Sequence, residues 1–157
     1  MGTFIVHGGK PLKGEITPQG AKNEALQVIC AVLLTSEKIT IRNIPDISDV
    51  NMLIELIISM GVKVIRETDS VASFEAVNID LDYLQTSEFR AQSSSLRGSI
   101  MIVGPLLARF GKAFIPKPGG DKIGRRRVDT HFTGFQKLGA RFEFDSSDPF
   151  LKLKHPH

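Results

Sequence analysis

Apolar and polar positions along this chain follow two periods, and the changes between them mark the expected helices and strands. Apolar residues recur every three to four positions in some stretches, as in helices, and alternate in others, as in strands. The expected helices cover residues 22–34, 50–60, 96–110 and 128–138. The expected strands cover residues 3–6, 13–17, 39–41, 62–65, 74–79, 113–116 and 140–144, and residues 151–157 resemble a strand fragment with a basic tail. The pattern predicts a mixed α/β (α+β) domain.

Residues at the expected helix ends support these boundaries. The first helix is apolar on nearly every face, which predicts burial on all sides. Residues 45–49 offer capping side chains for the second helix, and Gly61 is suited to a left-handed C-cap. Pro105 should kink or break the third helix. The run Ser93–Ser95 places Arg97 at or just inside that helix's start, where a cation gains nothing from the helix dipole. A ligand contact and a structural role both stay open for Arg97.

The order of the expected elements repeats within the chain. Helix, strand, loop, helix, glycine cap and strand occur over about residues 21–80 and again over about 90–150. The sequence Met60–Val64 is echoed by Leu138–Phe142. An internal repeat of this length predicts a fold assembled from copies of one α/β unit. The second copy carries a glycine-rich basic loop where the first has Asn43–Asp46.

This loop, Pro118–Asp129, holds the densest candidate chemistry in the chain. Its glycines allow the backbone to approach a ligand closely. Its arginines suit the paired hydrogen bonds that bind phosphate or carboxylate. Asp121 lies among these cations and could touch whatever they hold. From the loop alone, a basic surface turn that carries a solvated acid is the favoured interpretation.

Composition restricts the class of protein. The chain has 157 residues, of which 41% are hydrophobic and 24% charged, as in a globular domain with its own core. A formal charge of +3 permits a small acidic ligand. There is no Trp and one Tyr, and the ten Phe lie mostly in apolar patterns, whereas a nucleic-acid module usually adds exposed aromatic side chains to its basic surface. We therefore expect no nucleic-acid partner.

Several other site classes are not expected. The single cysteine, Cys30, lies in an apolar run and is expected to be a buried side chain rather than a reactive thiol. His155 and His157 lack an evident third ligand, so no metal site is expected. The N-terminus does not resemble a signal peptide, and no uncharged apolar run is long enough to span a bilayer. These features predict a cytoplasmic protein without a membrane partner.

Motifs spread along the chain resemble those of a known family. They are Gly20-Ala21-Lys22-Asn23, Leu96-Arg97-Gly98-Ser99-Ile100, Gly104-Pro105-Leu106-Leu107-Ala108-Arg109-Phe110-Gly111, and the loop pattern Pro118-Gly119-Gly120, Ile123-Gly124, Arg126, Val128-Asp129 and His131. In this order, and over nearly the whole chain, they are similar to the UDP-N-acetylglucosamine 1-carboxyvinyltransferase family of enolpyruvyl transferases. The resemblance implies an inside-out α/β barrel of βαβαββ-type units, here incomplete. It also implies transfer of enolpyruvyl from phosphoenolpyruvate to the 3-hydroxyl of UDP-N-acetylglucosamine, the first committed step of peptidoglycan synthesis.

The resemblance also implies a domain organisation. Residues 1–20 would be N-terminal strands that pack with the second domain of the family, and residues 21–157 a partial catalytic domain with two of its three repeats. The third repeat and the second domain are not in this sequence, so the chain alone is expected to be an incomplete catalyst. A non-catalytic fragment that binds nucleotide sugar or phosphate is an alternative. A structural remnant that self-associates through exposed edges is another.

The family's substrate contacts map onto individual residues of this chain. The residues implied to hold phosphoenolpyruvate are Lys22, Arg97 and Arg126. Asn23 would bind the sugar, and the backbone around Val128 and Asp129 would line the nucleotide site. The resemblance implies no cofactor. For Lys22 and Asn23, the alternative from the residues alone is a helix start with a solvated lysine.

Asp121 departs from the usual family pattern. Most members carry a cysteine as the acid at this position, and a minority carry Asp. An unperturbed aspartic acid, with a pKa of about 3.9, is ionised at neutral pH. Asp121 can therefore donate a proton only when bound anions offset the positive field of the neighbouring arginines. Fosfomycin, an epoxide that alkylates the usual thiol, is expected not to inactivate this protein through Asp121.

Overall fold

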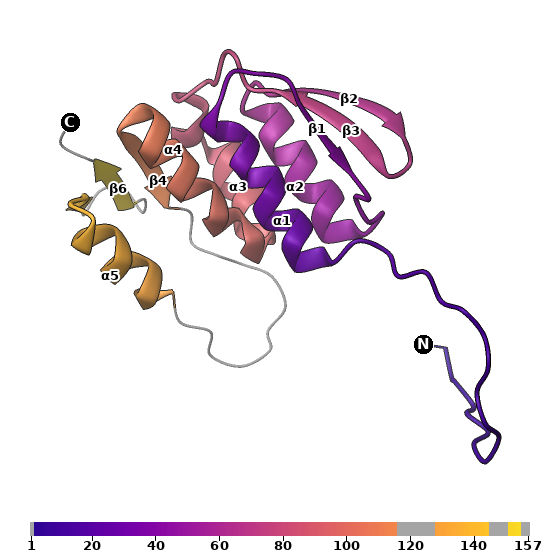
Figure 1. Ribbon diagram of the computed structural model, residues 1–157. Coiled ribbons are helices and arrows are strands. Elements are labelled where there is room, and N and C mark those ends of the chain that lie inside the picture. The colour runs from indigo at the N-terminus through magenta and orange to yellow at the C-terminus, as the bar shows by residue number, and fades with distance from the viewer. Residues whose placement is uncertain (1, 116–127, 145–150, 155–157) are drawn as a thin grey trace.

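The computed structural model describes residues 2–115, 128–144 and 151–154 (Figure 1). The helices are α1 (Lys22–Ala31), α2 (Ser48–Ser59), α3 (Ser87–Ser95), α4 (Val103–Phe110) and α5 (Asp129–Lys137). The short 3-10 helices are η1 (Val32–Leu34), η2 (Tyr83–Gln85) and η3 (Arg97–Ile102). The strands are β1 (Ile39–Arg42), β2 (Lys63–Thr68), β3 (Val71–Glu75), β4 (Lys112–Ile115), β5 (Arg141–Phe144) and β6 (Leu151–Lys154).

The strands form two antiparallel sheets with the same internal order. One sheet runs β1-β3-β2 and the other β4-β6-β5, so the last strand to appear in the chain lies in the middle each time. The order α1-β1-α2-β2-β3 is matched by α4-β4-α5-β5-β6. The repeated order of elements expected from the sequence is therefore present, and the last strand of each copy lies at the centre of its sheet.

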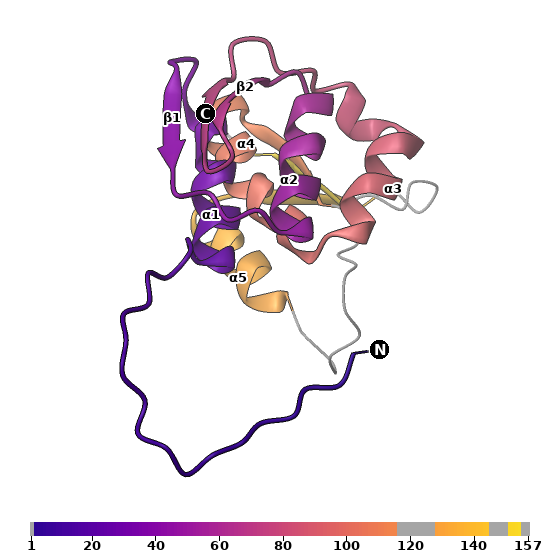
Figure 2. The ribbon, with the colours of Figure 1, turned by 90° about the vertical axis from the view of Figure 1, so that its right-hand side faces the viewer.

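The core lies between the helices and the inner faces of the sheets. Helices α1 to α4 gather into one group, with the sheet of β1, β2 and β3 along one side of it (Figures 1 and 2). Apolar side chains are in the interior because removing them from water stabilises the fold. The largest fully buried ones are Phe74, Phe89, Ile29, Leu33, Leu53, Leu56, Ile57, Met60, Leu84, Ile102, Leu106 and Leu153.

The first helix is amphipathic rather than buried on all sides. Ile29 and Cys30 are buried in α1, but Val28 and Leu34 remain 44% and 51% exposed. Only one face of this element packs against α2 and η3. An apolar composition without a polar stripe therefore did not distinguish the inner face from the outer one.

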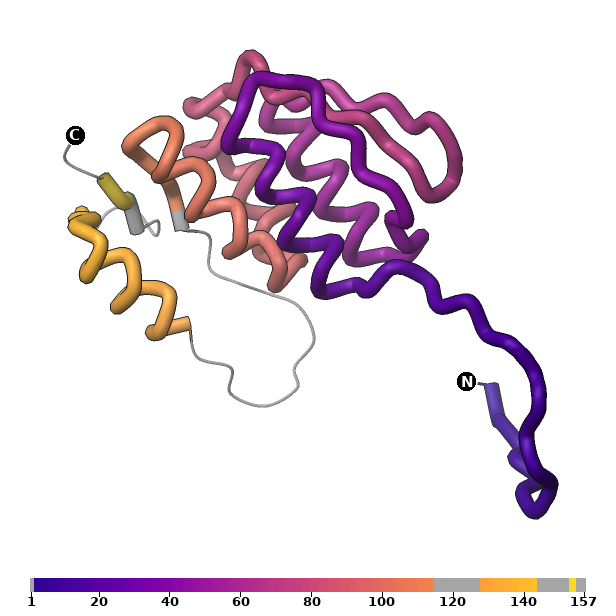
Figure 3. The backbone as a smooth tube through the Cα atoms, viewed as in Figure 1, coloured from indigo at the N-terminus to yellow at the C-terminus, as the bar shows by residue number. Residues whose placement is uncertain are grey.

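The predicted strands over residues 3–6 and 13–17 are not present. Residues 2–20 form no helix or strand and extend away from the body of the molecule (Figure 3). Their large apolar side chains are 79–99% exposed: Phe4, Ile5, Val6, Leu12 and Ile16. A strand requires a neighbour to pair its backbone groups, and this segment has no strand partner among the described residues. Its assignment to a second domain stays a prediction.

The region before α4 also differs from expectation. Residues 87–95 form α3, so Ser93–Ser95 end one helix rather than begin the next. Arg97 begins η3, which passes directly into α4 after Ile102, because Ile102 and Val103 both have right-handed helical backbone angles. Pro105 lies in the first turn of α4, where the missing N–H has no intrahelical partner to lose. The helical run is therefore not interrupted at Pro105, and only its type changes, from 3-10 to α-helix, between Ile102 and Val103.

The predictions for the helix caps and for the last strand of each sheet are partly confirmed. Gly61 adopts a φ of 100° after α2, which confirms the left-handed cap. The expected side-chain cap of α2 is wrong, because Ile47 is its N-cap residue and contributes no side-chain hydrogen bond. The third strand of the first sheet covers Val71–Glu75 rather than 74–79. The C-terminal strand fragment is present as β6.

Across the described ranges, none of the helices is long and apolar enough to cross a membrane.

Candidate functional site

The start of α1 is fixed by a close backbone contact with the segment that connects β1 to α2. A Cβ atom on Gly20 would lie 1.9 Å from the carbonyl oxygen of Asn43, so only glycine fits there. Asn43 itself adopts a φ of 59°, in the left-handed region that Asn tolerates better than most residues. The glycine of the Gly20–Asn23 motif therefore sets where the first turn of α1, and with it Lys22, is placed.

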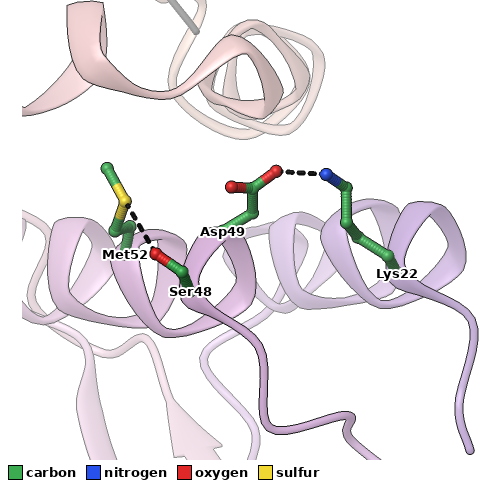
Figure 4. A network of polar contacts seen from close by, with 4 residues as sticks. All are labelled: Lys22, Ser48, Asp49 and Met52. Atoms are coloured by element: carbon green, nitrogen blue, oxygen red, sulfur yellow. Dashed lines mark hydrogen bonds and ion pairs between the residues drawn. The ribbon is translucent and has the colours of Figure 1, made fainter. Parts of the chain in front are cut away.

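Lys22 forms an ion pair with Asp49 across the starts of two helices. The ammonium Nζ contacts the carboxylate Oδ2 of Asp49 in the first turn of α2 (Figure 4). An acid in that position also interacts favourably with the helix dipole. Asn23, the next residue of α1, is exposed and has no recorded side-chain hydrogen bond within the described part of the chain.

Arg97 begins η3, which packs against α1. A Cβ atom on Gly98 would lie 3.2 Å from Cδ1 of Leu26, so η3 begins in contact with α1. Leu26 is one helical turn from Lys22 and on the same face. Arg97 is half-buried, and its guanidinium makes no hydrogen bond or ion pair with another residue that the structure describes. Two predicted ligand cations are thus brought to one region from distant parts of the sequence.

The start of α5 presents the predicted nucleotide-site backbone. The carbonyl of Val128 accepts hydrogen bonds from the N–H groups of His131 (3.0 Å) and Phe132 (3.4 Å). Asp129 is the exposed first residue of the helix. Figures 1 and 2 show α1, α2 and α5 beginning on the same lower side of the molecule. The helix starts that carry the predicted site residues therefore face the same way.

Packing of two aromatic side chains holds α5 in place. The rings of Phe132 and Phe142 meet edge to face with centroids 5.7 Å apart. Phe135 contacts the position above Gly104 of α4, at 4.0 Å from where a Cβ would be. The remaining predicted site residues, Asp121 and Arg126, lie outside the described residues.

Arg109 has a structural role that the sequence pattern did not reveal. Its Nη1 donates hydrogen bonds to the carbonyls of Leu33 (3.1 Å), Thr35 (3.0 Å) and Ala76 (2.8 Å). Its guanidinium also lies 4.9 Å from the centroid of the Phe110 ring. The donors of this cation are used to join α4 to the first repeat, so we place Arg109 outside the candidate site.

The Lys22–Asp49 pair is the contact of the candidate site that sequence reasoning missed. The sequence pattern indicates only a capping role for Asp49. An i,i+4 spacing would have indicated a pair on one helix, but these partners are 27 residues apart. No local signal in the sequence identifies such a pair.

The single thiol is unsuited to nucleophilic chemistry. Cys30 is buried, and burial raises the pKa of its thiol from 9.0 to about 12. The thiolate, which is the reactive form, is therefore scarce at neutral pH. Among the described residues there is also no group of three or more His, Cys, Asp or Glu side chains that could hold a metal ion.

Several curated proteins with similar sequences have the same name. The chain is 60% identical over 147 residues to the UDP-N-acetylglucosamine 1-carboxyvinyltransferase of Bacteroides thetaiotaomicron, covering 94% of this chain and 34% of that protein. It is 56% identical over 146 residues to the protein of the same name from Porphyromonas gingivalis, covering 93% and 34%. The chain thus spans about a third of the length of these relatives. The resemblance found in the sequence motifs is confirmed.

A solved structure and a family model agree with the resemblance to enolpyruvyl transferases. The enolpyruvyl transferase NikO from Streptomyces tendae superposes with a TM-score of 0.70 at 20% identity, covering 96% of this chain and 32% of that one. This likeness confirms the fold class, an incomplete α/β enolpyruvyl transferase fold. Residues 6–155 match the family described as EPSP synthase (3-phosphoshikimate 1-carboxyvinyltransferase), and the chain therefore belongs to this family of carboxyvinyltransferases.

Proposed function

We propose that this chain forms part of an enzyme that transfers enolpyruvyl from phosphoenolpyruvate to the 3-hydroxyl of UDP-N-acetylglucosamine, with release of phosphate. The observation that carries the proposal is 56–60% identity, over nearly the whole chain, to proteins named UDP-N-acetylglucosamine 1-carboxyvinyltransferase. The reaction would commit the sugar to peptidoglycan, and so support cell shape and division. Because both substrates are water-soluble anions of the cell interior, we place it in the cytoplasm.

The reaction needs cations and one acid. In the addition step a proton passes to C3 of phosphoenolpyruvate, the sugar oxygen bonds to C2, and the hydroxyl proton goes to a base. In the elimination step phosphate leaves C2 and C3 loses a proton, which restores the double bond. Lys22 and Arg97, together with Arg126, would hold the phosphate and carboxylate. Asn23 would bind the sugar, and the Val128–Asp129 backbone the nucleotide.

Asp121 is the proposed proton donor to C3. Aspartic acid suits this role only while the bound anions keep its proton in place. A carboxylate does not offer the thiol that fosfomycin alkylates, and the one thiol of the chain is the buried Cys30. Incubation with fosfomycin should therefore leave both residues unmodified in intact-mass spectra. A covalent adduct on Asp121 that accompanies lost activity would contradict this assignment.

A second candidate function follows from the length of the chain. Because it spans about a third of its relatives, the 157 residues could bind phosphoenolpyruvate or the nucleotide sugar without turning them over. On this alternative, residues 21–157 are a partial catalytic domain with two of three repeats. The unpaired segment 2–20 would then either pack with a second domain or promote self-association.

Phosphate release separates these alternatives. The purified chain is incubated with both substrates beside an Asp121→Ala variant, and calorimetry measures the binding of each substrate. Release that disappears in the variant supports catalysis with Asp121 as acid. Binding without release supports the non-catalytic fragment. Neither binding nor release, with the circular dichroism of a folded protein, would contradict both functions.

A further inference from the structure

The Lys22–Asp49 ion pair lies at the surface. There it matters more for the position of the lysine ammonium than for the free energy of unfolding. The two side chains are 47% and 39% exposed. Ion pairs this exposed are screened by water and contribute little to the free energy of unfolding. A free lysine side chain, however, samples many rotamers. The contact therefore restricts where the ammonium lies in the folded protein.

The backbones that carry the two partners are themselves held in place. The side-chain amide of Asn51 donates to Oδ1 of Asp46 at 2.7 Å, and Nη2 of Arg66 donates to Oδ1 of Asn51 at 2.7 Å. These bonds join the first turns of α2 to the segment before it and to β2. The contact of Gly20 with Asn43 fixes the start of α1 against that same segment. Asp49 is thus presented to Lys22 by a rigid arrangement.

The ion pair leaves most of the lysine's donors unused. An ammonium carries three N–H donors and no acceptor. One donor is directed at Oδ2 of Asp49, and no other hydrogen bond of Lys22 is recorded within the described ranges. Two donors therefore remain for an anion, on a side chain with 47% of its surface open to solvent.

We propose that Asp49 is a positioning residue that orients the Lys22 ammonium toward an anionic substrate group. This rests on the proposed function, in which Lys22 binds the phosphate or carboxylate of phosphoenolpyruvate. Asp49 acts through Lys22 and does not touch the substrate.

Two roles of Asp49 predict opposite effects on binding. A carboxylate close to an anion site repels the anion. If Asp49 served only as an acid at the start of α2, its removal would tighten the binding of phosphoenolpyruvate. If it positions Lys22, its removal weakens binding, because the ammonium loses its preferred orientation. The sign of the change decides between the two roles.

The test is a titration of the isotope-labelled chain with phosphoenolpyruvate and, separately, inorganic phosphate, followed by backbone amide NMR. This method detects weak binding and reports it at residues 20–25 and 96–99. We expect Asp49→Ala to raise the Kd about three- to fivefold, because an exposed ion pair worth up to about 1 kcal/mol can bias the lysine rotamers by no more than that. Asp49→Asn should restore part of the affinity, because its side-chain oxygen still accepts from Nζ.

Two further variants make the result specific to the pair. In a Lys22→Met background, Asp49→Ala should produce no additional weakening, because there is no ammonium left to position. Glu55→Gln removes a carboxylate from an exposed position of the same helix and should leave the Kd within about twofold. Thermal unfolding of each variant checks that the fold is retained.

Two results would overturn the inference in distinguishable ways. Saturable binding by the unaltered chain that is unchanged or tighter in Asp49→Ala would reject the positioning role and leave the proposed function intact. If the unaltered chain shows no saturable shifts at residues 20–25 or 96–99, the proposed substrate contacts fail, and the positioning role fails with them.

Discussion

The two repeats share their order of elements and sheet topology but differ in how firmly the second helix is held. In the first repeat, α2 buries Val50, Leu53, Ile54, Leu56 and Ile57. In the second, α5 has no fully buried residue and rests on half-buried Phe132 and Phe135. The stretch between strand and helix also differs, with Asn43–Ile47 in the first and residues 116–128 in the second. One unit supplies most of the packing, and the other carries the candidate acid.

This difference shows that a shared topology does not impose shared packing. Pairing in a three-stranded sheet requires only that the strands meet in register. A longer connection adds little closure entropy, so the second repeat can accommodate the glycine-rich basic segment. The following predictions test this contrast, beginning with the largest expected effect.

Truncation of Phe74 should be far more damaging than truncation of Phe132. Phe74 is fully buried in the central strand of the first sheet, so Phe74→Ala should lower the free energy of unfolding by about 3–5 kcal/mol. Phe132 is half-buried, and Phe132→Ala should lower it by less than about 2 kcal/mol. Urea denaturation followed by circular dichroism measures both. Equal losses would show that the two repeats contribute equally to the core.

Removal of the Arg109 guanidinium should weaken the junction between the repeats. Arg109→Met leaves the carbonyls of Leu33, Thr35 and Ala76 without this donor, and should cost about 1.5–3 kcal/mol of stability. Lys112→Met removes a cation from an exposed position of β4 and should change stability by less than about 0.5 kcal/mol. Thermal and urea denaturation compare the two. If Arg109→Met leaves the free energy of unfolding unchanged, apolar packing alone joins the repeats.

Substitution of glycine by alanine should lower the stability of the protein at Gly20 and raise it at Gly134. Gly20→Ala forces the start of α1 away from Asn43 and should cost about 1–3 kcal/mol. Gly134 lies within α5, and an added Cβ there meets nothing within 4 Å. Gly134→Ala should therefore stabilise the protein by about 0.5–1 kcal/mol. Melting temperatures show whether each variant is less or more stable than the unaltered protein. A Gly20→Ala variant as stable as the unaltered protein would disprove the close contact.

The buried thiol should make stability fall in alkaline solution. The pKa of Cys30 is about 12 in the folded protein and near 9.0 when exposed, so above pH 9 the unfolded state binds fewer protons than the folded state. The free energy of unfolding then decreases as pH rises, by about 1.4 kcal/mol at pH 10 from this group. Comparison with Cys30→Ala isolates the effect, because other titrating groups are common to both. Parallel pH profiles would contradict burial of the thiol.

Sequence patterns predicted the features that depend on neighbouring residues. The apolar spacing of α2 and α5 and the cap at Gly61 are local, and so is the alternation in β1 and β4. The repeat followed from the order of these elements. Helix α3 was missed because it buries only Phe89 and Ser93 and shows no apolar stripe.

Features that depend on distant residues were not predictable in this way. Residues 3–6 and 13–17 were expected as two short strands around a turn, but they have no strand to pair with among the residues that the structure describes. The Lys22–Asp49 pair joins two helices whose packing is set by the whole core. The resemblance identified Lys22 as a candidate ligand, but nothing in the sequence indicated which acid it contacts.

The central position of β3 and β6 has a consequence for the order in which the protein can fold during synthesis. In each sheet the two outer strands are made first, and neither is paired with the other. Ile39 of β1 can pair only after Phe74 of β3 has been made, and Lys112 of β4 only after Lys154 of β6. Until that last strand leaves the ribosome, the earlier strands have unpaired edges, which favour association with other chains. Each sheet therefore closes in one late step, when its last strand enters between the two that preceded it.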